Sequence, residues 1–257
     1  MIDFMIRTAR DAGQVICDYF GHARQVKTKS DKGDVVTQAD LDSDKLIISR
    51  IRERFPDDGI LTEESGALSL PEGARVWIVD PLDGTRNFSR GVPIFCVSIG
   101  VIRDGRPIAG VVHDPIHDET FHAVEGQGAF LNGERLHVCD EDDLELVMVN
   151  MAWTRQTSDG RSFMPMAVRL VERTNYTRRY GSAALALAYT AAGRLHATVL
   201  VDLKPWDVAA GILLIKEAGG VVTDFYGDPV TLPKPSIDLL AANPGLHGLL
   251  LREIFAP

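Results

Sequence analysis

The chain has 257 residues, 45% hydrophobic and 25% charged, enough to bury a substantial core in one domain or two closely joined lobes. Its net charge of −9 disfavours binding to nucleic acid or to an anionic membrane surface. No apolar run approaches the ~18 residues of a membrane span, and the three widely spaced cysteines do not suggest a disulfide framework or a zinc site. We therefore expect a cytoplasmic protein.

Two helices are predicted near the N-terminus. Apolar residues recur at helical spacing over residues 3–20. Thr37 and Asp40 have the spacing of a capping box, which predicts a second helix over residues 38–55. Lys29 lies between them in the polar segment 27–34, which is typical of a solvated loop. Local sequence alone makes Asp40 a cap and Lys29 a surface residue.

Carboxylates follow two predicted strands in the first half of the chain. Glu63 comes directly after a short apolar strand, and Asp80 and Asp83 follow the apolar run 76–79. Pro81 has no backbone donor, so we expect it to end the strand and to turn the chain between the two aspartates. Two carboxylates ~4 Å apart repel by about 4 kcal/mol at an effective dielectric of about 20. A bound metal ion is the simpler interpretation, and a solvated Asp-Gly turn is the alternative.

The next two residues favour an anion. Gly84 lets the backbone approach a bound group, and Thr85 can start a helix whose free N–H groups attract negative charge. Ligands for a cation and a cradle for an anion are therefore predicted side by side.

The sequence of the middle of the chain predicts antiparallel strands, followed by a change from strands alone to alternating helices and strands. Residues 95–124 alternate β-rich segments with turns, and the acidic stretch 140–145 resembles a junction. Helices and strands alternate beyond it. We place a boundary there between an N-terminal lobe, residues 1–142, which carries most candidate metal ligands, and a C-terminal lobe, residues 143–257, which carries Asp207.

Two helix starts in the C-terminal lobe carry polar residues. Gly181 and Ser182 begin a helix over 182–192, where they form either an ordinary cap or an anion contact. Asp207 lies in the first turn of a helix over 206–218, a position that the helix dipole favours without any function. The alternation of elements makes the fold class α/β, or α+β in some schemes.

Four segments taken together resemble the inositol monophosphatase family. They are residues 34–40 (DVVTQAD), 63–65 (EES), 77–85 (WIVDPLDGT) and 206–211 (WDVAAG), with further agreement at 181–183 and 217–220. Each segment alone is a weak to moderate signal of the family, but the order and spacing of the four segments match the family pattern across essentially the whole chain. The resemblance implies a layered α-β-α-β-α sandwich, usually a homodimer, that is a magnesium-dependent and lithium-sensitive phosphatase of small phosphorylated metabolites.

The resemblance also assigns roles by position. Two or more Mg²⁺ ions would be bound by an all-oxygen ligand set, namely Glu63, Asp80, the Leu82 carbonyl, Asp83 and Asp207. Thr85 and Asp40 match the pair that orients and activates the attacking water, with Glu63 and Asp83 as further catalytic residues. Substrate binding is implied for Asp83, Gly84, Thr85, Gly181, Ser182, Ala183 and Lys29.

The chain departs from the family pattern at Leu200, where many inositol-specific members carry a glutamate that contacts substrate hydroxyls. A leucine accepts no hydrogen bond, so the site loses part of its discrimination among polyols. Inositol 1-phosphate remains the first substrate expected, histidinol phosphate is the runner-up, and fructose 1,6-bisphosphate and nucleotides are further candidates. A non-catalytic regulator on the same fold is the alternative from another class. Arg86 replaces a common small hydroxyl residue, and we interpret it as a surface arginine rather than a contact to a second acidic group.

Overall fold

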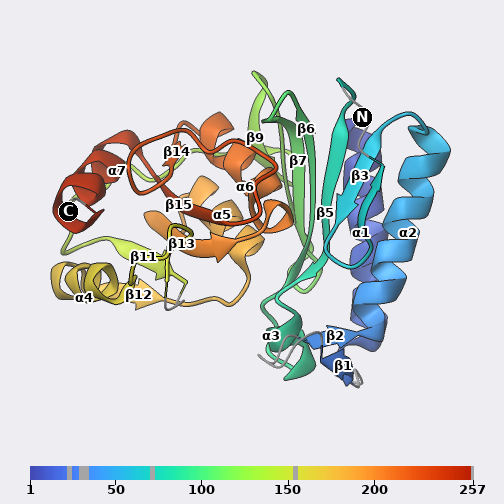
Figure 1. Cartoon of the computed structure of the whole chain (residues 1–257), viewed down its shortest axis with the longest axis horizontal. Coiled ribbons are helices and arrows are strands. Elements are labelled where there is room, and N and C mark those ends of the chain that lie inside the picture. The colour runs from blue at the N-terminus through green and yellow to red at the C-terminus, as the bar shows by residue number, and fades with distance from the viewer. Residues whose placement is uncertain (22–24, 29–34, 70–72, 153–155, 256–257) are drawn as a thin grey trace.

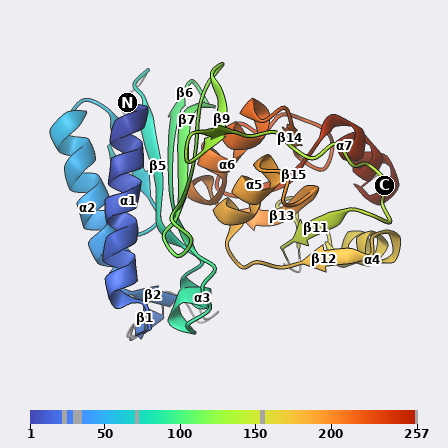
Figure 2. The same cartoon turned by 180° about the vertical axis from the view of Figure 1, so that it is seen from behind.

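The computed structural model describes residues 1–21, 25–28, 35–69, 73–152 and 156–255. Its elements form five alternating layers of helices and sheets (Figure 1), in the same order from behind (Figure 2). The helices of these layers are α1 (Ile2–Tyr19) and α2 (Gln38–Arg54) in one outer layer. The middle layer contains α5 (Ala183–Ala191) and α6 (Pro205–Glu217), and the other outer layer contains α4 (Met164–Arg173), α7 (Pro244–Leu250) and the π-helical η1 (Leu251–Phe255). The predicted α-β-α-β-α sandwich is therefore confirmed.

The two main sheets differ in topology. The larger has the order β10-β9-β8-β7-β6-β5-β3-β4 and is antiparallel except where β3 lies beside β5. Its strands are β3 (Gly59–Thr62), β4 (Gly66–Ser69), β5 (Val76–Asp83), β6 (Cys96–Arg103), β7 (Arg106–Asp114), β8 (Glu119–Val124), β9 (Gly128–Leu131) and β10 (Glu134–Arg135). The smaller has the order β12-β11-β13-β15-β14, with β11 parallel to both neighbours. Its strands are β11 (Met148–Met151), β12 (Tyr176–Arg178), β13 (Ala197–Leu203), β14 (Val221–Thr223) and β15 (Ile237–Ala242).

The polar segment after α1 differs from its prediction. Gln25–Thr28 forms β1, which pairs with β2 (Val35–Thr37) in a separate antiparallel ribbon, so the predicted loop is wrong for residues 27 and 28. Strand β11 was also not predicted. The same is true of β4 and β12, which share a reason. Each has only three or four residues and lies at a sheet edge, where no buried alternation marks a strand in the sequence.

A buried cluster between the two sheets joins the two halves of the chain. It contains residues of α5 and α6 together with residues of β5 to β9. Two glycines let α6 lie directly on the larger sheet: a Cβ at Gly100 would lie 2.8 Å from the Ala209 Cβ, and one at Gly110 would lie 2.9 Å from the Ala210 Cα. This close packing brings the start of α6 beside β5. The lobe boundary near residue 142 stays a prediction.

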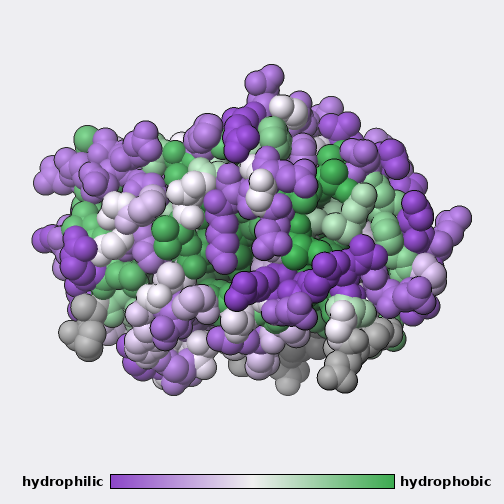
Figure 3. Space-filling view, turned by 90° about the horizontal axis from the view of Figure 1, so that it is seen from above, coloured by the Kyte–Doolittle hydropathy of each residue, from purple (hydrophilic) through white to green (hydrophobic). Residues whose placement is uncertain are grey.

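The surface seen from above is largely hydrophilic, with hydrophobic residues showing between the polar ones (Figure 3). Within the described part of the chain, no helix combines the length and apolar character needed to cross a membrane. Large apolar side chains such as Trp77 and Phe121 are fully buried in the layers.

Helix α2 holds β5 in place through Ser43. The buried Ser43 hydroxyl donates to the Pro81 carbonyl at 3.0 Å. A Ser43→Ala substitution should lower the free energy of unfolding by about 2 kcal/mol, because it leaves a buried carbonyl without a partner. Urea denaturation measures the loss. Ser49→Ala, at an exposed position of the same helix, should change stability by less than about 0.5 kcal/mol. Equal losses in the two variants would contradict the role of this bond.

Candidate active site

Asp80 and Asp83 are brought together by a bulge in β5. Asp80 pairs with Ser98 of β6 and Asp83 pairs with Cys96, so three steps along β5 match two steps along β6. Residues three apart on a regular strand face opposite sides of the sheet. The extra residue of the bulge removes this alternation and lets both carboxylates face the same side.

The prediction that Pro81 ends the strand is wrong, because β5 continues through it to Asp83. Pro81 lies within the bulge, where one residue of β5 is not paired with β6. A proline fits there, because its backbone nitrogen has no proton to donate to the neighbouring strand. The chain turns at Gly84 instead, which has a φ of 97° and precedes the short helix α3 (Thr85–Ser89).

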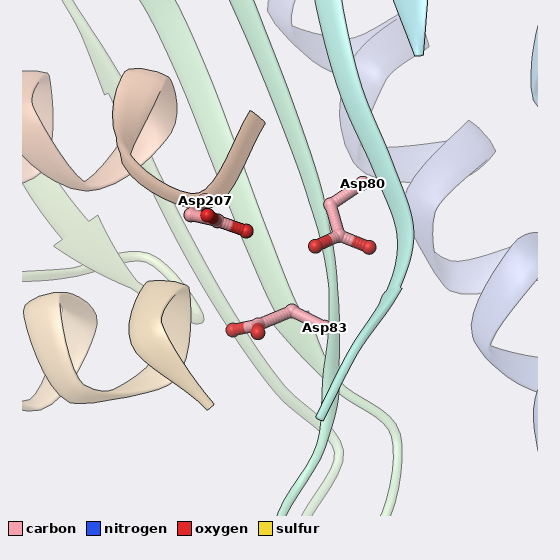
Figure 4. A group of neighbouring side chains, drawn as sticks. All are labelled: Asp80, Asp83 and Asp207. Carbon is pink, nitrogen blue, oxygen red and sulfur yellow. The ribbon is translucent and has the colours of Figure 1, made fainter. Parts of the chain in front are cut away.

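Asp207 completes a group of three carboxylates. One oxygen from each of Asp80, Asp83 and Asp207 lies within 4.8 Å of the others, and the three side chains converge from β5 and the start of α6 (Figure 4). Asp207 Oδ2 also accepts the backbone N–H of Lys204 at 2.7 Å. Asp207 is therefore both a helix cap, as local sequence indicates, and a neighbour of the two acids of β5.

The start of α5 holds Asp83. Asp83 Oδ2 accepts the Ser182 hydroxyl at 2.6 Å and the Ala184 backbone N–H at 2.7 Å. The Cys96 thiol lies 3.8 Å from the same oxygen. Ser182 therefore binds a carboxylate of the protein, which is the anion contact that its position at a helix start favours.

Burial and mutual repulsion make the three acids hard to ionise. Burial raises the pKa of Asp80 well above its usual range, and the charges of Glu63, Asp83 and Asp207 raise it further. Burial, followed by the charge of Asp83, raises the pKa of Asp207 in the same way. Burial also raises the pKa of Asp83, against the lowering by its bonds from Ser182 and α5.

This donor set fits a hard divalent cation. Buried carboxylates that repel one another are stabilised by a cation between them, and an all-oxygen set of this kind suits Mg²⁺. The acidic cluster could therefore hold a metal ion through Asp80, Asp83 and Asp207.

Glu63 does not belong to this group of three, but it lines the same cleft. Its backbone N–H donates to the Val79 carbonyl at 3.1 Å, which ties the end of β3 to β5. The turn that follows is fixed by Ser65, whose hydroxyl donates to Asp44 Oδ2 of α2 at 2.5 Å. The cleft has a volume of about 180 Å³ and is lined by Glu63, Asp80, Leu82, Asp83, Gly84, Thr85, Arg86, Gly181 and Asp207.

Thr85 and Asp40 form a hydrogen-bonded pair at the edge of this cleft. The Thr85 hydroxyl lies 3.0 Å from Asp40 Oδ1 and 3.0 Å from the Leu82 carbonyl oxygen, and its single proton can bond only one of them at a time. Asp40 is fully buried, and its Oδ2 accepts the backbone N–H and the hydroxyl of Thr37. Burial raises the pKa of Asp40, although the bonds from Thr37 and Thr85 oppose this effect.

A second pocket of about 200 Å³ adjoins the cleft and shares Asp83, Gly181 and Asp207 with it. Its other lining residues are Asn150, Met151, Ala152, Arg179, Ser182, Ala183, Leu200 and Leu203. Gly181, Ser182 and Ala183, the residues predicted to bind substrate at the start of α5, thus line one pocket beside the acids. Leu200, which departs from the family pattern, lines the same pocket.

Sequence reasoning missed two asparagines of this region. The Asn87 amide donates to the Tyr180 carbonyl at 2.7 Å, and Asn150 Oδ1 accepts the Tyr180 N–H at 3.2 Å, so together they fix the chain before Gly181. Asn87 follows the DGT motif closely enough to be noticed, whereas nothing near Asn150 in the sequence marks it. Lys29 lies outside the described residues. Arg86 is exposed but lines the cleft.

Comparisons with known proteins agree over the whole chain. Residues 1–255 match the model of the inositol monophosphatase family. The chain is 40% identical over 226 residues to the fructose-1,6-bisphosphatase/inositol-1-monophosphatase of Thermotoga maritima, covering 88% of this chain and 85% of that one. It is 41% identical over 256 residues to the Nus factor SuhB of Pasteurella multocida, covering 99% and 95%. A crystal structure of the extragenic suppressor protein SuhB from Bartonella henselae superposes with a TM-score of 0.90 at 34% identity, covering 98% and 97%. This chain belongs to the inositol monophosphatase family.

Proposed function

We propose that the protein is a Mg²⁺-dependent phosphatase that hydrolyses monoesters of small phosphorylated metabolites. The observation that carries the proposal is the meeting of Glu63, Asp80, Asp83 and Asp207 in one cleft with the Thr85–Asp40 pair at its edge. The mutual repulsion of acids from three distant segments opposes folding, and a bound cation would offset it.

Two or more Mg²⁺ ions would be held by Glu63, Asp80, Asp83, Asp207 and the Leu82 carbonyl. When bound, the ions would neutralise the ester dianion, make a water molecule more acidic and stabilise the leaving alkoxide. The protein's own part is to orient the ester and the water. We assign phosphate binding to the backbone N–H groups of Gly84 and Thr85, together with Lys29.

The Thr85–Asp40 pair can direct the attacking water. A threonine hydroxyl has one proton and two acceptor sites, so Thr85 can donate to Asp40 Oδ1 and at the same time accept a hydrogen bond from water. The bonds from Thr37 hold the Asp40 carboxylate in this orientation. A water placed in this way is oriented for attack on phosphorus.

Thr85→Ala should therefore lower kcat about 100-fold or more and change KM little, because the hydroxyl acts on the water and not on the bound ester. Steady-state phosphate release measures both constants. Thr85→Ser retains the hydroxyl and should recover most of the lost kcat. Equal losses of substrate affinity and turnover in Thr85→Ala would instead assign the hydroxyl to phosphate binding.

Phosphate release from a substrate panel tests the proposed function. Inositol 1-phosphate is the first substrate to assay, followed by histidinol phosphate, fructose 1,6-bisphosphate and nucleotide phosphates. We expect release that requires Mg²⁺ and that Li⁺ inhibits. An absence of release from every ester of the panel in Mg²⁺ would refute the proposal.

A second candidate is a regulatory protein that uses the same fold without catalysis. Relatives named Nus factor SuhB favour it, since that name describes a role other than hydrolysis. A regulator would show no turnover in the panel and would keep its function in an Asp83→Asn variant. From the family we also propose a homodimer in the cytoplasm, and light scattering of the purified protein tests the dimer.

A further inference from the structure

The pocket beside the acidic cleft, which we call the leaving-group pocket, has an apolar wall. Its lining includes Leu200 and Met151, both buried, and Leu203. Because it opens beside Asp83 and Asp207, it is placed to hold the part of an ester that departs from phosphate. Its volume of about 200 Å³ lies below the range of about 300–1,000 Å³ for drug-sized ligands, so its occupant is compact.

Two lining residues of this pocket offer hydrogen-bond donors. Asn150 is only 4% exposed, and its Oδ1 accepts the Tyr180 N–H. This bond orients the amide, so that its Nδ2, which has no hydrogen-bond partner among the described residues, is left to donate to an occupant. Arg179 also lines the pocket, and its guanidinium is a permanently charged donor.

Three side-chain acceptors of the lining already accept hydrogen bonds from the protein. Asn150 Oδ1 is bonded to Tyr180, Asp83 Oδ2 to Ser182 and α5, and Asp207 Oδ2 to Lys204. Asp83 and Asp207 also each contribute an oxygen to the acidic group with Asp80. Leu200 offers no acceptor. With a leucine at position 200, the lining offers fewer acceptors for the hydroxyl protons of a polyol than a glutamate there would provide, whereas Arg179 and Asn150 can donate to a group that accepts hydrogen bonds.

On the basis of the function proposed above, we propose that the preferred ester has a compact leaving group bearing a second anion, a carboxylate or a phosphate. Arg179 and Asn150 bind this anion, while Leu200 and Leu203 pack against the carbon skeleton. When a divalent cation neutralises Asp83 and Asp207 of the same lining, the guanidinium of Arg179 disfavours a cationic leaving group such as histidinol.

Matched pairs of esters test the preference in the wild-type protein with Mg²⁺. The carboxylate arm compares glycerate 3-phosphate with the glycerol phosphate of the same configuration, which has a hydroxymethyl group in place of the carboxylate. The phosphate arm compares fructose 1,6-bisphosphate with fructose 1-phosphate. We expect kcat/KM to be about tenfold or more higher for the anionic member of at least one pair, as one charged hydrogen bond predicts. The arm that shows it identifies the anion.

Variants locate the binding group. Arg179→Gln should lower this preference about tenfold, and Asn150→Asp, which replaces a donor by a charged acceptor of the same shape, should lower it further. Arg178→Gln, at an exposed neighbouring position that does not line the pocket, is the control and should leave the preference unchanged.

The outcomes separate this inference from the proposed function. Hydrolysis of the neutral esters, or of p-nitrophenyl phosphate, without preference in either pair would overturn the anionic leaving group and leave the phosphatase standing. A preference that survives in both Arg179→Gln and Asn150→Asp would overturn the binding site. No hydrolysis of any ester would overturn both proposals.

Discussion

An Asp83→Asn variant is expected to lose more than about 100-fold in kcat/KM for every ester that the wild-type protein hydrolyses. Replacing groups that only orient metal ligands lowers metal affinity or activity by about 10–100-fold, and Asp83 lies in the acidic group itself. Asparagine can still accept the bonds from Ser182 and Ala184, but it brings no negative charge to a cation. Phosphate release measured over a range of Mg²⁺ concentrations gives the loss of turnover and of metal affinity.

The same variant should remain folded, and this makes its loss of activity interpretable. Two ionised carboxylates whose oxygens lie within 4.8 Å of each other repel by about 3 kcal/mol or more at an effective dielectric of about 20. Relief of this repulsion offsets the weakening of two hydrogen bonds, which amounts to about 1–2 kcal/mol.

Melting curves with chelator and with Mg²⁺ complete the test. Mg²⁺ at about 100 times its Kd should stabilise the wild type by about 2.7 kcal/mol and the variant much less. Asp57→Asn, an exposed position away from the cleft, removes the same charge and should respond as the wild type does. If Asp83→Asn gained as much from Mg²⁺ as the wild type, Asp83 would not belong to the metal centre.

Gly84→Ala is expected to lower the free energy of unfolding by about 3 kcal/mol or more and to remove most of the activity. Gly84 has a φ of 97°, where a residue with a side chain is strained by about 1–3 kcal/mol. In addition, an added Cβ would lie 2.8 Å from the Ile94 carbonyl oxygen, so the backbone must move. Gly84 connects Asp83 to Thr85, and a displacement of ~1 Å at such groups lowers turnover about 100-fold.

Gly160→Ala separates the two effects. Gly160 also has a positive φ, 84°, but among the described residues no atom beyond its chain neighbours lies within 4 Å of the position of its added Cβ. Its substitution should therefore cost only the conformational part, about 1 kcal/mol, and leave turnover unchanged. Urea denaturation and phosphate release compare the variants. Equal destabilisation by both would show that contact with Ile94 plays no part.

Much of the fold follows from local patterns in the sequence. The apolar spacing that predicts a helix over 3–20 agrees with α1. The turns expected within residues 95–124 include the one at Asp104 and Gly105, which joins β6 to β7. Pro81 misleads, because a proline usually ends a strand, and only the register against β6 reveals the bulge that accommodates it.

The site could be predicted only in part, because some of its contacts join distant segments. The convergence of Asp80, Asp83 and Asp207 was expected from the family resemblance. No local pattern in the sequence between Asp83 and Asp207 indicates that the two residues lie close together in the fold. The bonds from Ser182 and Ala184 to Asp83 span about a hundred residues, and only the packing of α5 between the sheets produces them. Asn150 lies on the unpredicted strand β11, and its role depends on the backbone of Tyr180. Such contacts are set by tertiary packing, which has no local signal.

Two of the acids at the proposed centre also cap the starts of helices. This second role affects how the sequences of distant relatives are interpreted. Asp40 binds the Thr37 N–H at the start of α2, and Asp207 binds the Lys204 N–H at the start of α6. Loss of such a bond destabilises a protein by about 1 kcal/mol whether or not it is an enzyme. Selection for a folded chain alone would therefore preserve both aspartates. A relative that has lost catalytic activity and gained another function can therefore retain an apparently complete set of catalytic acids.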